Sequence, residues 1–323
     1  MKIAFLMKNR PDYEARIPDG LDWFQIAPGE DGNYSDESLA KVADVDALIL
    51  SHEPVHEQLL AACGRLKIIQ RTGVGYNTVD TQAAARRGIP VCNLGDVNKD
   101  ALGEHGMALM LGLARRLVQI HGHTAAADWE AARALCDTTY ELQGRTLGVL
   151  GFGRSGYELA RRARAFGMEI CFHSRSQVDA RLREAVEARE LGFEALLAES
   201  DFLAVTLSLN PSTEGMIDAA ALALMKPSAF LIDMARGGIV HEQALADALN
   251  ADRLAGAGMD VFSEEPIRRD NPLLKAKNVL LTAHTAGTTK ECTDREIGWS
   301  VENVRRYLER GEKPRWIVNG VEV

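Results

Sequence analysis

Short apolar runs alternate with amphipathic segments along most of this chain. In its first third, apolar runs predict buried strands at residues 3–7, 47–50 and 67–70. Apolar residues three or four positions apart predict helices at residues 57–62 and 81–87. Such alternation is typical of a parallel sheet with helices on its faces.

A second set of alternating segments follows a long helix that is predicted at residues 99–117. Apolar runs predict strands at 147–150, 169–173, 202–207, 230–233, 255–260 and 279–281, and helices are predicted at 154–166 and 241–250. This set has the strands and helices of a complete doubly wound domain.

The last part of the chain is predicted to be an amphipathic helix followed by a strand. Within residues 290–310, one helical face carries Ile297, Val301, Val304, Tyr307 and Leu308. A short apolar segment at 316–318 predicts the strand.

A glycine motif joins the first strand of the second set to its first helix. The sequence LGVLGFGRSG places Gly151, Gly153 and Gly156 directly after the apolar run at 147–150. In a dinucleotide-binding turn, the first glycine permits the tight turn, the second admits the pyrophosphate and the third lets the helix pack on the strand. The amino end of the helix also attracts phosphate. An ordinary glycine-rich turn is the alternative, but the strand–turn–helix–strand context favours a dinucleotide site.

Because this motif begins near the middle of the 323 residues, one domain is expected to be inserted into another. The predicted fold class is α/β, with two doubly wound parallel-sheet domains. Residues 98–287 are expected to form a Rossmann dinucleotide-binding domain. Residues 1–97 and 288–323 are expected to form a flavodoxin-like substrate domain.

The residues after the second Rossmann strand bear on the choice of cofactor. An NAD-specific site usually has Asp or Glu about 20 residues beyond the motif to hold the ribose 2′-hydroxyl. Here Ser174 occupies that position and Arg175 follows it. A hydroxyl and a guanidinium suit a 2′-phosphate, which a carboxylate would repel. We therefore expect NADP(H) to be favoured over NAD(H), the alternative being a solvated arginine on a surface turn.

Candidate chemical groups follow three later strands. Arg236 lies in LIDMARGGIV, Asp260 and Glu265 lie in GMDVFSEEP, and His284 lies in LLTAHTAGTT. Parallel strands end at one edge of a sheet, so these residues are expected to lie near each other. His284 would donate a proton to a substrate carbonyl, Glu265 would orient its imidazole, and Arg236 would bind the substrate and polarise the carbonyl. Asp260 could accept a hydrogen bond from a nicotinamide carboxamide.

The composition and net charge argue against some classes of binding partner and favour one cellular compartment. The net charge of −9 and the pI of about 5.5 argue against nucleic acid or an anionic membrane as a partner. No signal peptide or membrane span is evident, and the scattered cysteines 63, 92, 136, 171 and 292 suit reduced thiols of a cytoplasmic protein. No metal site is expected. His121 and His123 have no further ligands nearby in the sequence, and His52 and His56 could equally border a substrate pocket or lie in a solvated loop.

Several motifs in order resemble the D-isomer-specific 2-hydroxyacid dehydrogenase family over nearly the whole chain. They are RTGVGYNTVD, LGEHGMALML, LQGRTLGVLGFGRSG, ALMKPSAFLIDMARGG, GMDVFSEEP and TAHTAGTT. The resemblance implies catalytic roles for Arg236, Glu265 and His284, and a nicotinamide contact at Asp260. It also implies that backbone N–H groups of Val74 and Gly75 bind the substrate carboxylate.

The resemblance extends the expected cofactor contacts, and it also shows departures. The further expected contacts are Phe152, Arg154, Ser155, Ser208, Thr213, Met234 and Ala235. Ser208 replaces the usual Pro, Asn210 the usual Thr and Asp233 the usual Asn. With Ser174 in place of an acid, the chain is closest in character to NADP-preferring glyoxylate/hydroxypyruvate reductases. Glu265 disfavours formate dehydrogenase, where Gln is expected.

The predicted function is hydride transfer between NADP(H) and a small 2-oxo or D-2-hydroxy acid. A dinucleotide-sensing, corepressor-like dimeric scaffold on the same fold is the alternative. The apolar segment 101–117 and the residues around Trp129 are more hydrophobic than a solvent-facing crossover requires. The resemblance implies that the cofactor domains pair there, so we expect a two-fold symmetric homodimer.

Overall fold

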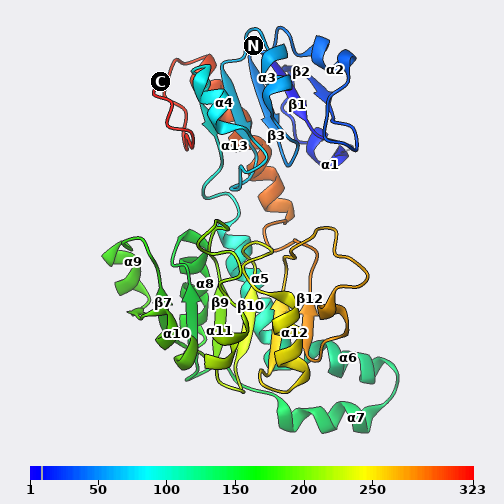
Figure 1. Cartoon of the computed structure of the whole chain (residues 1–323), viewed down its shortest axis with the longest axis vertical. Coiled ribbons are helices and arrows are strands. Elements are labelled where there is room, and N and C mark those ends of the chain that lie inside the picture. The colour runs from blue at the N-terminus through cyan, green and yellow to red at the C-terminus, as the bar shows by residue number, and fades with distance from the viewer. Residues whose placement is uncertain (9) are drawn as a thin grey trace. The chain divides into compact units, whose positions relative to one another are not determined.

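The computed structural model describes residues 1–8 and 10–323, and its chain divides into two compact units (Figure 1). Unit 1 comprises Met1–Asn98 and Thr289–Val323, and unit 2 comprises Lys99–Thr288. Each unit has its own parallel sheet with helices packed on it, as the alternating apolar segments predicted.

Unit 1 contains a five-stranded parallel sheet in the order β2-β1-β3-β4-β5. Its strands are β1 (Lys2–Leu6), β2 (Asp22–Ile26), β3 (Ala47–Leu50), β4 (Ile68–Arg71) and β5 (Val91–Cys92). Its helices are α1 (Pro11–Glu14), α2 (Asp36–Lys41), α3 (Glu57–Ala62), α4 (Thr81–Arg86) and α13 (Lys290–Leu308). This strand order is that of flavodoxin-like folds, which confirms the predicted fold of this part of the chain.

Successive residues of the unit 1 strands enter different cores. In β3, Leu48 and Leu50 belong to one buried apolar cluster, whereas Ala47 and Ile49 belong to another on the opposite sheet face. Helix α13 contributes Ile297, Val301 and Val304 to the second cluster, so its predicted apolar face is buried. Because side chains alternate along a strand, a fully apolar run can fill both faces of a covered sheet.

Unit 2 contains a seven-stranded parallel sheet in the order β12-β11-β10-β9-β6-β7-β8. Its strands are β6 (Thr146–Leu150), β7 (Glu169–His173), β8 (Arg189–Glu190), β9 (Phe202–Val205), β10 (Phe230–Asp233), β11 (Gly256–Met259) and β12 (Val279–Leu281). The order is that of a Rossmann sheet extended by one strand. The order reverses beside β6, which is therefore the point where such sheets bind ligands at their carboxyl ends.

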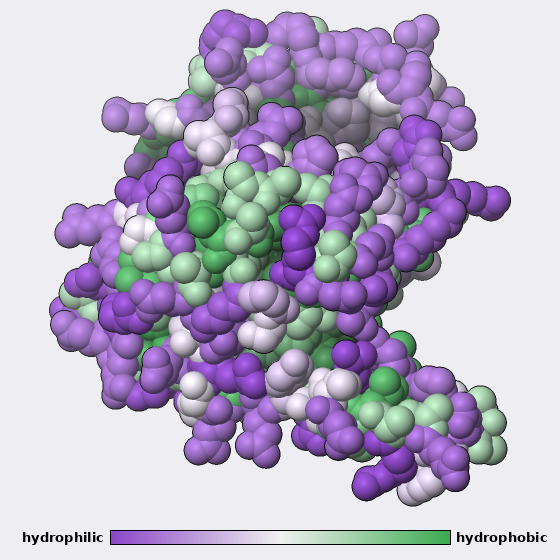
Figure 2. All heavy atoms as spheres, turned by 60° about the horizontal axis from the view of Figure 1, so that its bottom comes forward, coloured by the Kyte–Doolittle hydropathy of each residue, from purple (hydrophilic) through white to green (hydrophobic). Residues whose placement is uncertain are grey.

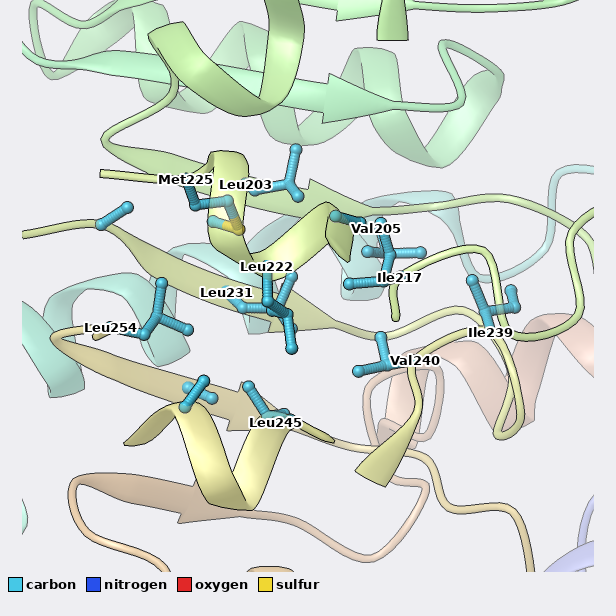
Figure 3. Close-up of a cluster of buried hydrophobic side chains, with 14 of the residues drawn as sticks. Leu203, Val205, Ile217, Leu222, Met225, Leu231, Ile239, Val240, Leu245 and Leu254 are labelled. Carbon is cyan, nitrogen blue, oxygen red and sulfur yellow. The ribbon is translucent and has the colours of Figure 1, made fainter. Parts of the chain in front are cut away.

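Unit 2 also contains helices, several of which pack on the faces of this sheet. They are α5 (Lys99–Ala114), α6 (Leu117–Ala125), α7 (Trp129–Ala134), α8 (Arg154–Ala165), α9 (Ala180–Ala185), α10 (Phe193–Glu199), α11 (Ala219–Leu224) and α12 (Glu242–Asn250), with 3-10 turns η1 (Leu135–Thr138) and η2 (Pro272–Lys275). Figure 3 shows one core, where Leu203 and Leu231 of the sheet meet Leu222 of α11 and Leu245 of α12. This packing supports the strand ends from which the site loops leave.

Two predicted elements differ from those observed. The helix predicted at 99–117 ends at Ala114, because Arg116 adopts a left-handed backbone conformation with φ of 48° before α6 begins. The strand predicted at 316–318 is reduced to a single antiparallel bridge between Ile317 and Cys92. Within the described ranges, no helix is long and apolar enough to cross a membrane.

Candidate active site

The glycine turn between β6 and α8 has the shape that a dinucleotide site requires. Gly151 has a φ of 98°, and a Cβ on it would lie 2.8 Å from Leu207. A Cβ on Gly156 would lie 2.5 Å from the carbonyl oxygen of Gly151, so only glycine fits there. A Cβ on Gly153 would meet nothing within 4 Å, which leaves open space at the amino end of α8. These residues therefore fit a dinucleotide, whose phosphates would be held at that helix end.

The expected cofactor contacts near this turn differ in how they can act. Arg154 and Ser155 are the first residues of α8 and are accessible to solvent. Phe152 is buried, and its ring lies 4.5 Å from that of Phe172 between centroids. Met234 and Ala235 are also buried in apolar clusters. The side chains of these last three residues pack in the protein, so backbone atoms are their available contacts.

Ser174 and Arg175 lie on the exposed loop after β7. The Ser174 hydroxyl donates to the carbonyl oxygen of Ser176 at 3.0 Å. The Arg175 guanidinium reaches the loop after β9 and donates to the Ser212 hydroxyl. Arg175 is exposed to solvent and contacts a neighbouring loop at the carboxyl edge of the sheet.

The loop that receives Arg175 is organised by the residues that depart from the family pattern. Asn210 accepts from the Ser212 N–H at 3.0 Å and donates to the Ser208 carbonyl at 3.1 Å. Thr213 is buried, and its hydroxyl lies 2.8 Å from that same carbonyl. Asn210 and Thr213 thus shape the loop from inside, while Ser208 and Ser212 lie on its surface side.

Arg236 leaves β10 on a loop that crosses the loop after β11. A Cβ on Gly237 would lie 1.7 Å from the carbonyl oxygen of Phe262, so glycine allows the two backbones to touch. The guanidinium of Arg236 donates to the Ala235 carbonyl at 2.7 Å, and the residue is partly buried. Burial lowers the pKa of Arg236 from its usual value, while the negative charge of Glu265 acts in the opposite direction. The crossing therefore places the Arg236 cation near the Glu265 carboxylate.

His284 and Glu265 form a hydrogen-bonded pair. Nδ1 of His284 lies 2.6 Å from one Glu265 oxygen, and the other oxygen accepts from the Phe262 N–H at 3.0 Å. The backbone of His284 has a φ of 53°, a conformation that costs a non-glycine residue energy and is often found at functional sites. With Nδ1 facing Glu265, Nε2 is the ring nitrogen left to exchange a proton with a bound molecule.

Asp260 organises the loop that carries His284. Its carboxylate is fully buried and accepts from the backbone N–H groups of Thr285 and Ala286, each at 2.8 Å. The Thr282 hydroxyl donates to it at 2.6 Å, and His105 of α5 lies 3.1 Å from that hydroxyl. The Asp260 carbonyl accepts from the His284 N–H at 2.7 Å. The position of His284 therefore depends on Asp260, whose nicotinamide contact stays a prediction.

Asp233, which replaces the usual Asn, is a buried carboxyl beneath the Arg236 loop. One oxygen accepts from the Ala235 N–H at 2.9 Å, and the other has no hydrogen-bond partner within the described ranges. Burial raises the pKa of Asp233 to about 7. The site thus contains an acid that changes its charge near neutral pH.

The loop after β4 in unit 1 presents backbone groups rather than side chains. Val74 is exposed, and the Gly73 carbonyl accepts from the Leu94 N–H at 3.0 Å. The guanidinium of buried Arg71 lies beneath the loop, 3.2 Å from where a Cβ on Gly73 would be. His52 Nδ1 lies 3.3 Å from the same guanidinium. A positive charge therefore accompanies the Val74 and Gly75 N–H groups.

The other histidines and the cysteines were also candidates for metal binding. His123 lies 3.2 Å from Asp128, and His56 precedes α3. Across residues 1–8 and 10–323, no group of three or more His, Cys, Asp or Glu side chains is arranged to hold a metal ion. The free cysteines are Cys63, Cys92, Cys136, Cys171 and Cys292, and of these only Cys136 is exposed.

Sequence reasoning missed the residues that support the site from other parts of the fold. His105 was visible only as an interruption of an apolar stretch, although the motif LGEHG marks its position. Arg71 begins the motif RTGVG. For this motif, only the backbone N–H groups of Val74 and Gly75 were predicted to bind substrate, and not the Arg71 side chain. No sequence motif pointed to Asn93, whose side chain donates to the Val74 carbonyl in the loop after β4.

The chain is similar to known proteins over most of its length. The model of the D-isomer specific 2-hydroxyacid dehydrogenase NAD binding domain matches residues 107–286. A glyoxylate reductase from Thermococcus litoralis is 39% identical over 286 residues, covering 87% of this chain and 86% of its own. A hydroxypyruvate reductase from Blautia hydrogenotrophica is 32% identical over 305 residues, covering 90% and 93%.

A solved structure supports the same assignment. The crystal structure of a glyoxylate reductase from Paecilomyes thermophila superimposes with a TM-score of 0.84 at 28% identity, covering 98% of each chain. The glycine turn, the similarity to glyoxylate reductase and the family model together indicate a nicotinamide cofactor and a 2-hydroxyacid oxidoreductase. The chain belongs to the D-isomer specific 2-hydroxyacid dehydrogenase family.

Proposed function

We propose that this protein is an NADPH-dependent reductase of small 2-oxo acids, with His284 as the proton donor. The observation that carries the proposal is the 2.6 Å pair of His284 and Glu265 near the partly buried Arg236. Proteins similar to this chain include a glyoxylate reductase and a hydroxypyruvate reductase. Glyoxylate and hydroxypyruvate are therefore the first substrates to test.

Each of the site residues has a separate role in the reduction of the carbonyl group. A bound reduced nicotinamide supplies a hydride to the carbonyl carbon. His284 gives a proton from Nε2 to the carbonyl oxygen, so the product is a 2-hydroxy acid and the imidazole becomes neutral. Glu265 holds the ring through Nδ1, which leaves Nε2 for the substrate. Arg236 stabilises the negative charge that develops on the oxygen.

The substrate carboxylate is assigned to the loop of unit 1. A 2-oxo acid has a carboxylate next to its carbonyl, and backbone N–H groups of a loop can hold such an anion. The N–H groups of Val74 and Gly75 would hold the carboxylate, with the Arg71 charge 3.2 Å from the Cβ position of Gly73.

NADPH is proposed over NADH because of the loops after β7 and β9. Ser174 leaves no carboxylate to repel a 2′-phosphate, and Arg175 is already held at the carboxyl edge of the sheet by Ser212. A guanidinium at this edge can pair with a phosphate by a charge-assisted hydrogen bond.

The proposal is tested by absorbance at 340 nm. Purified protein is mixed with NADPH or NADH and with glyoxylate, hydroxypyruvate, pyruvate or phenylglyoxylate. We expect oxidation of NADPH by at least one small 2-oxo acid. Binding of NADPH without turnover of any of the four would contradict the reductase proposal and favour the dinucleotide-sensing scaffold.

We also propose a homodimer that pairs through unit 2. Helices α6 and α7 form an arm beside the sheet (Figure 1), and Figure 2 shows apolar side chains on this arm at the lower right. Leu117, Val118 and Trp129 are more than half exposed, and α6 buries no residue. A second copy would cover this apolar surface. Light scattering at micromolar concentration should give twice the mass of one chain, and the mass of a monomer would overturn the dimer.

A further inference from the structure

Two successive carbonyl groups of the unit 1 loop bind the same neighbouring segment. The Gly73 carbonyl accepts from the Leu94 N–H at 3.0 Å, and the Val74 carbonyl accepts from Nδ2 of Asn93 at 2.7 Å. The first contact joins two backbones, whereas the second depends on one side chain. Asn93 is therefore the only amide side chain in the described ranges that donates to this carbonyl.

These contacts determine where the loop N–H groups point. In a trans peptide unit, the N–H and the C=O point in opposite directions. The Val74 N–H shares its unit with the Gly73 carbonyl, and the Gly75 N–H shares its unit with the Val74 carbonyl. Both N–H groups are thus directed away from residues 93 and 94. Within the described ranges, neither donates to a protein acceptor.

Asn93 is itself held on several sides. It is buried, and its N–H donates to the Trp316 carbonyl at 3.2 Å. Its carbonyl lies 3.4 Å from Nε2 of Gln70, a side chain with no solvent exposure. Oε1 of Gln70 accepts from Asn303 of α13 at 2.7 Å. Buried hydrogen bonds therefore fix the backbone of Asn93, from which its side chain reaches the loop, and such networks hold a single arrangement when their groups are satisfied.

We propose that Asn93 is a positioning residue for the substrate carboxylate, acting by fixing the Val74–Gly75 peptide so that its N–H faces the bound acid. This inference rests on the proposed function. An amide is required because the Val74 carbonyl needs a donor. A carboxylate at residue 93 would offer no donor and would repel both this carbonyl and the substrate.

The main test is Asn93→Asp, which keeps the size of the side chain. We expect the KM for the 2-oxo acid that the wild type reduces to rise by at least about tenfold, because one charge-assisted hydrogen bond to the substrate would be lost. Inhibition by oxamate, a carboxylate analogue of the substrate, should weaken by a similar factor. The Kd for NADPH should stay unchanged, because its proposed site lies in unit 2.

Asn319→Asp is the matched control. Asn319 also bridges the β5 region with both ends of its amide, accepting from the Val91 N–H at 3.0 Å and donating to the Ile89 carbonyl at 2.9 Å. It does not contact residues 73–75. A structural loss in unit 1 would raise KM equally in both variants, whereas the proposal expects it in Asn93→Asp alone.

A milder pair covers the case in which Asn93→Asp does not fold. Asn93→Ser keeps a hydroxyl donor and Asn93→Ala has none, so the KM of the alanine variant should be the higher. Equal KM values for wild type and folded Asn93→Asp, or for the Ser and Ala variants, would overturn the inference. Equal KM changes in Asn93→Asp and Asn319→Asp would also overturn it. An inactive wild type would instead refute the proposed function, and oxamate affinity measured by calorimetry would then judge Asn93 alone.

Discussion

The carboxyl edges of the two sheets provide chemistry in different ways. In unit 2, ionisable side chains at the ends of β10, β11 and β12 meet, with His284 and Glu265 2.6 Å apart. In unit 1, the loop after β4 offers backbone N–H groups that neutral amides such as Asn93 hold in place. Proton transfer needs a group that changes its charge, whereas binding a carboxylate needs only fixed donors. The same edge of a parallel sheet can therefore serve catalysis through side chains or recognition through the backbone.

The largest effect is expected where a side chain carries the chemistry. His284→Ala should lower kcat by about 10² to 10⁴, the usual contribution of a positioned acid. The Kd for NADPH should not change, because the glycine turn is intact. His241→Ala is the control, since His241 is an exposed residue before α12 in the same unit. Turnover of His284→Ala near that of the control would remove His284 from the mechanism.

The choice of cofactor also depends on side chains of unit 2. The wild type should prefer NADPH over NADH by at least about tenfold in kcat/KM, from one guanidinium–phosphate pair worth about 1.5–3 kcal/mol. Ser174→Asp combined with Arg175→Ala should reverse the preference, by adding repulsion and removing attraction. Steady-state kinetics with both cofactors on both proteins measure this. Equal use of NADH by the wild type would mean that Arg175 plays no part in selection.

Asp233 predicts a pH dependence of stability that originates in unit 2. Its pKa of about 7 lies above the ordinary value of 3.8, so the folded state binds the proton more tightly than the unfolded state. The free energy of unfolding should therefore fall as the pH rises from about 4 to about 7. Asp233→Asn should stabilise the protein more at pH 8 than at pH 5, by at least about 1 kcal/mol, since one pKa unit corresponds to about 1.4 kcal/mol.

Unfolding curves at the two pH values measure the effect of Asp233. Asp137→Asn removes an exposed carboxylate from the same unit and is the control for net charge. If Asp233→Asn raises the free energy of unfolding by the same amount at both pH values, Asp233 is ionised in the folded protein throughout this range.

The smallest effect is expected at the side chain of Val74. Because the proposed contact uses the N–H of this residue, Val74→Ala should change the KM for the 2-oxo acid by less than about twofold, as for a substitution away from specific contacts. This result would separate a backbone site from a side-chain site. A tenfold rise in KM would mean that the exposed valine touches the substrate.

The local patterns of the sequence were sufficient for the fold class and for the residues in motifs. Apolar runs with turn signals predicted both parallel sheets, and the left-handed Arg116 was missed because the apolar pattern continues through it. Gly151, Gly153 and Gly156 could be recognised because a phosphate-binding turn requires glycine at a fixed spacing. Arg236, Glu265 and His284 could be grouped because each follows a strand, and parallel strands end at a common edge. Each of these inferences uses a physical rule that acts within a few residues.

Only the tertiary structure decided which residues support those groups. His105 reaches Thr282 across 177 positions, Arg175 reaches Ser212 across 37, and Asn93 reaches the Val74 carbonyl across 19. The sequence determined that Arg236, Glu265 and His284, the proposed catalytic residues, each follow a strand, because backbone geometry acts locally. The hydrogen bonds that aim them, and that aim the backbone donors of unit 1, form between segments brought together by packing of the cores, so no local pattern records them.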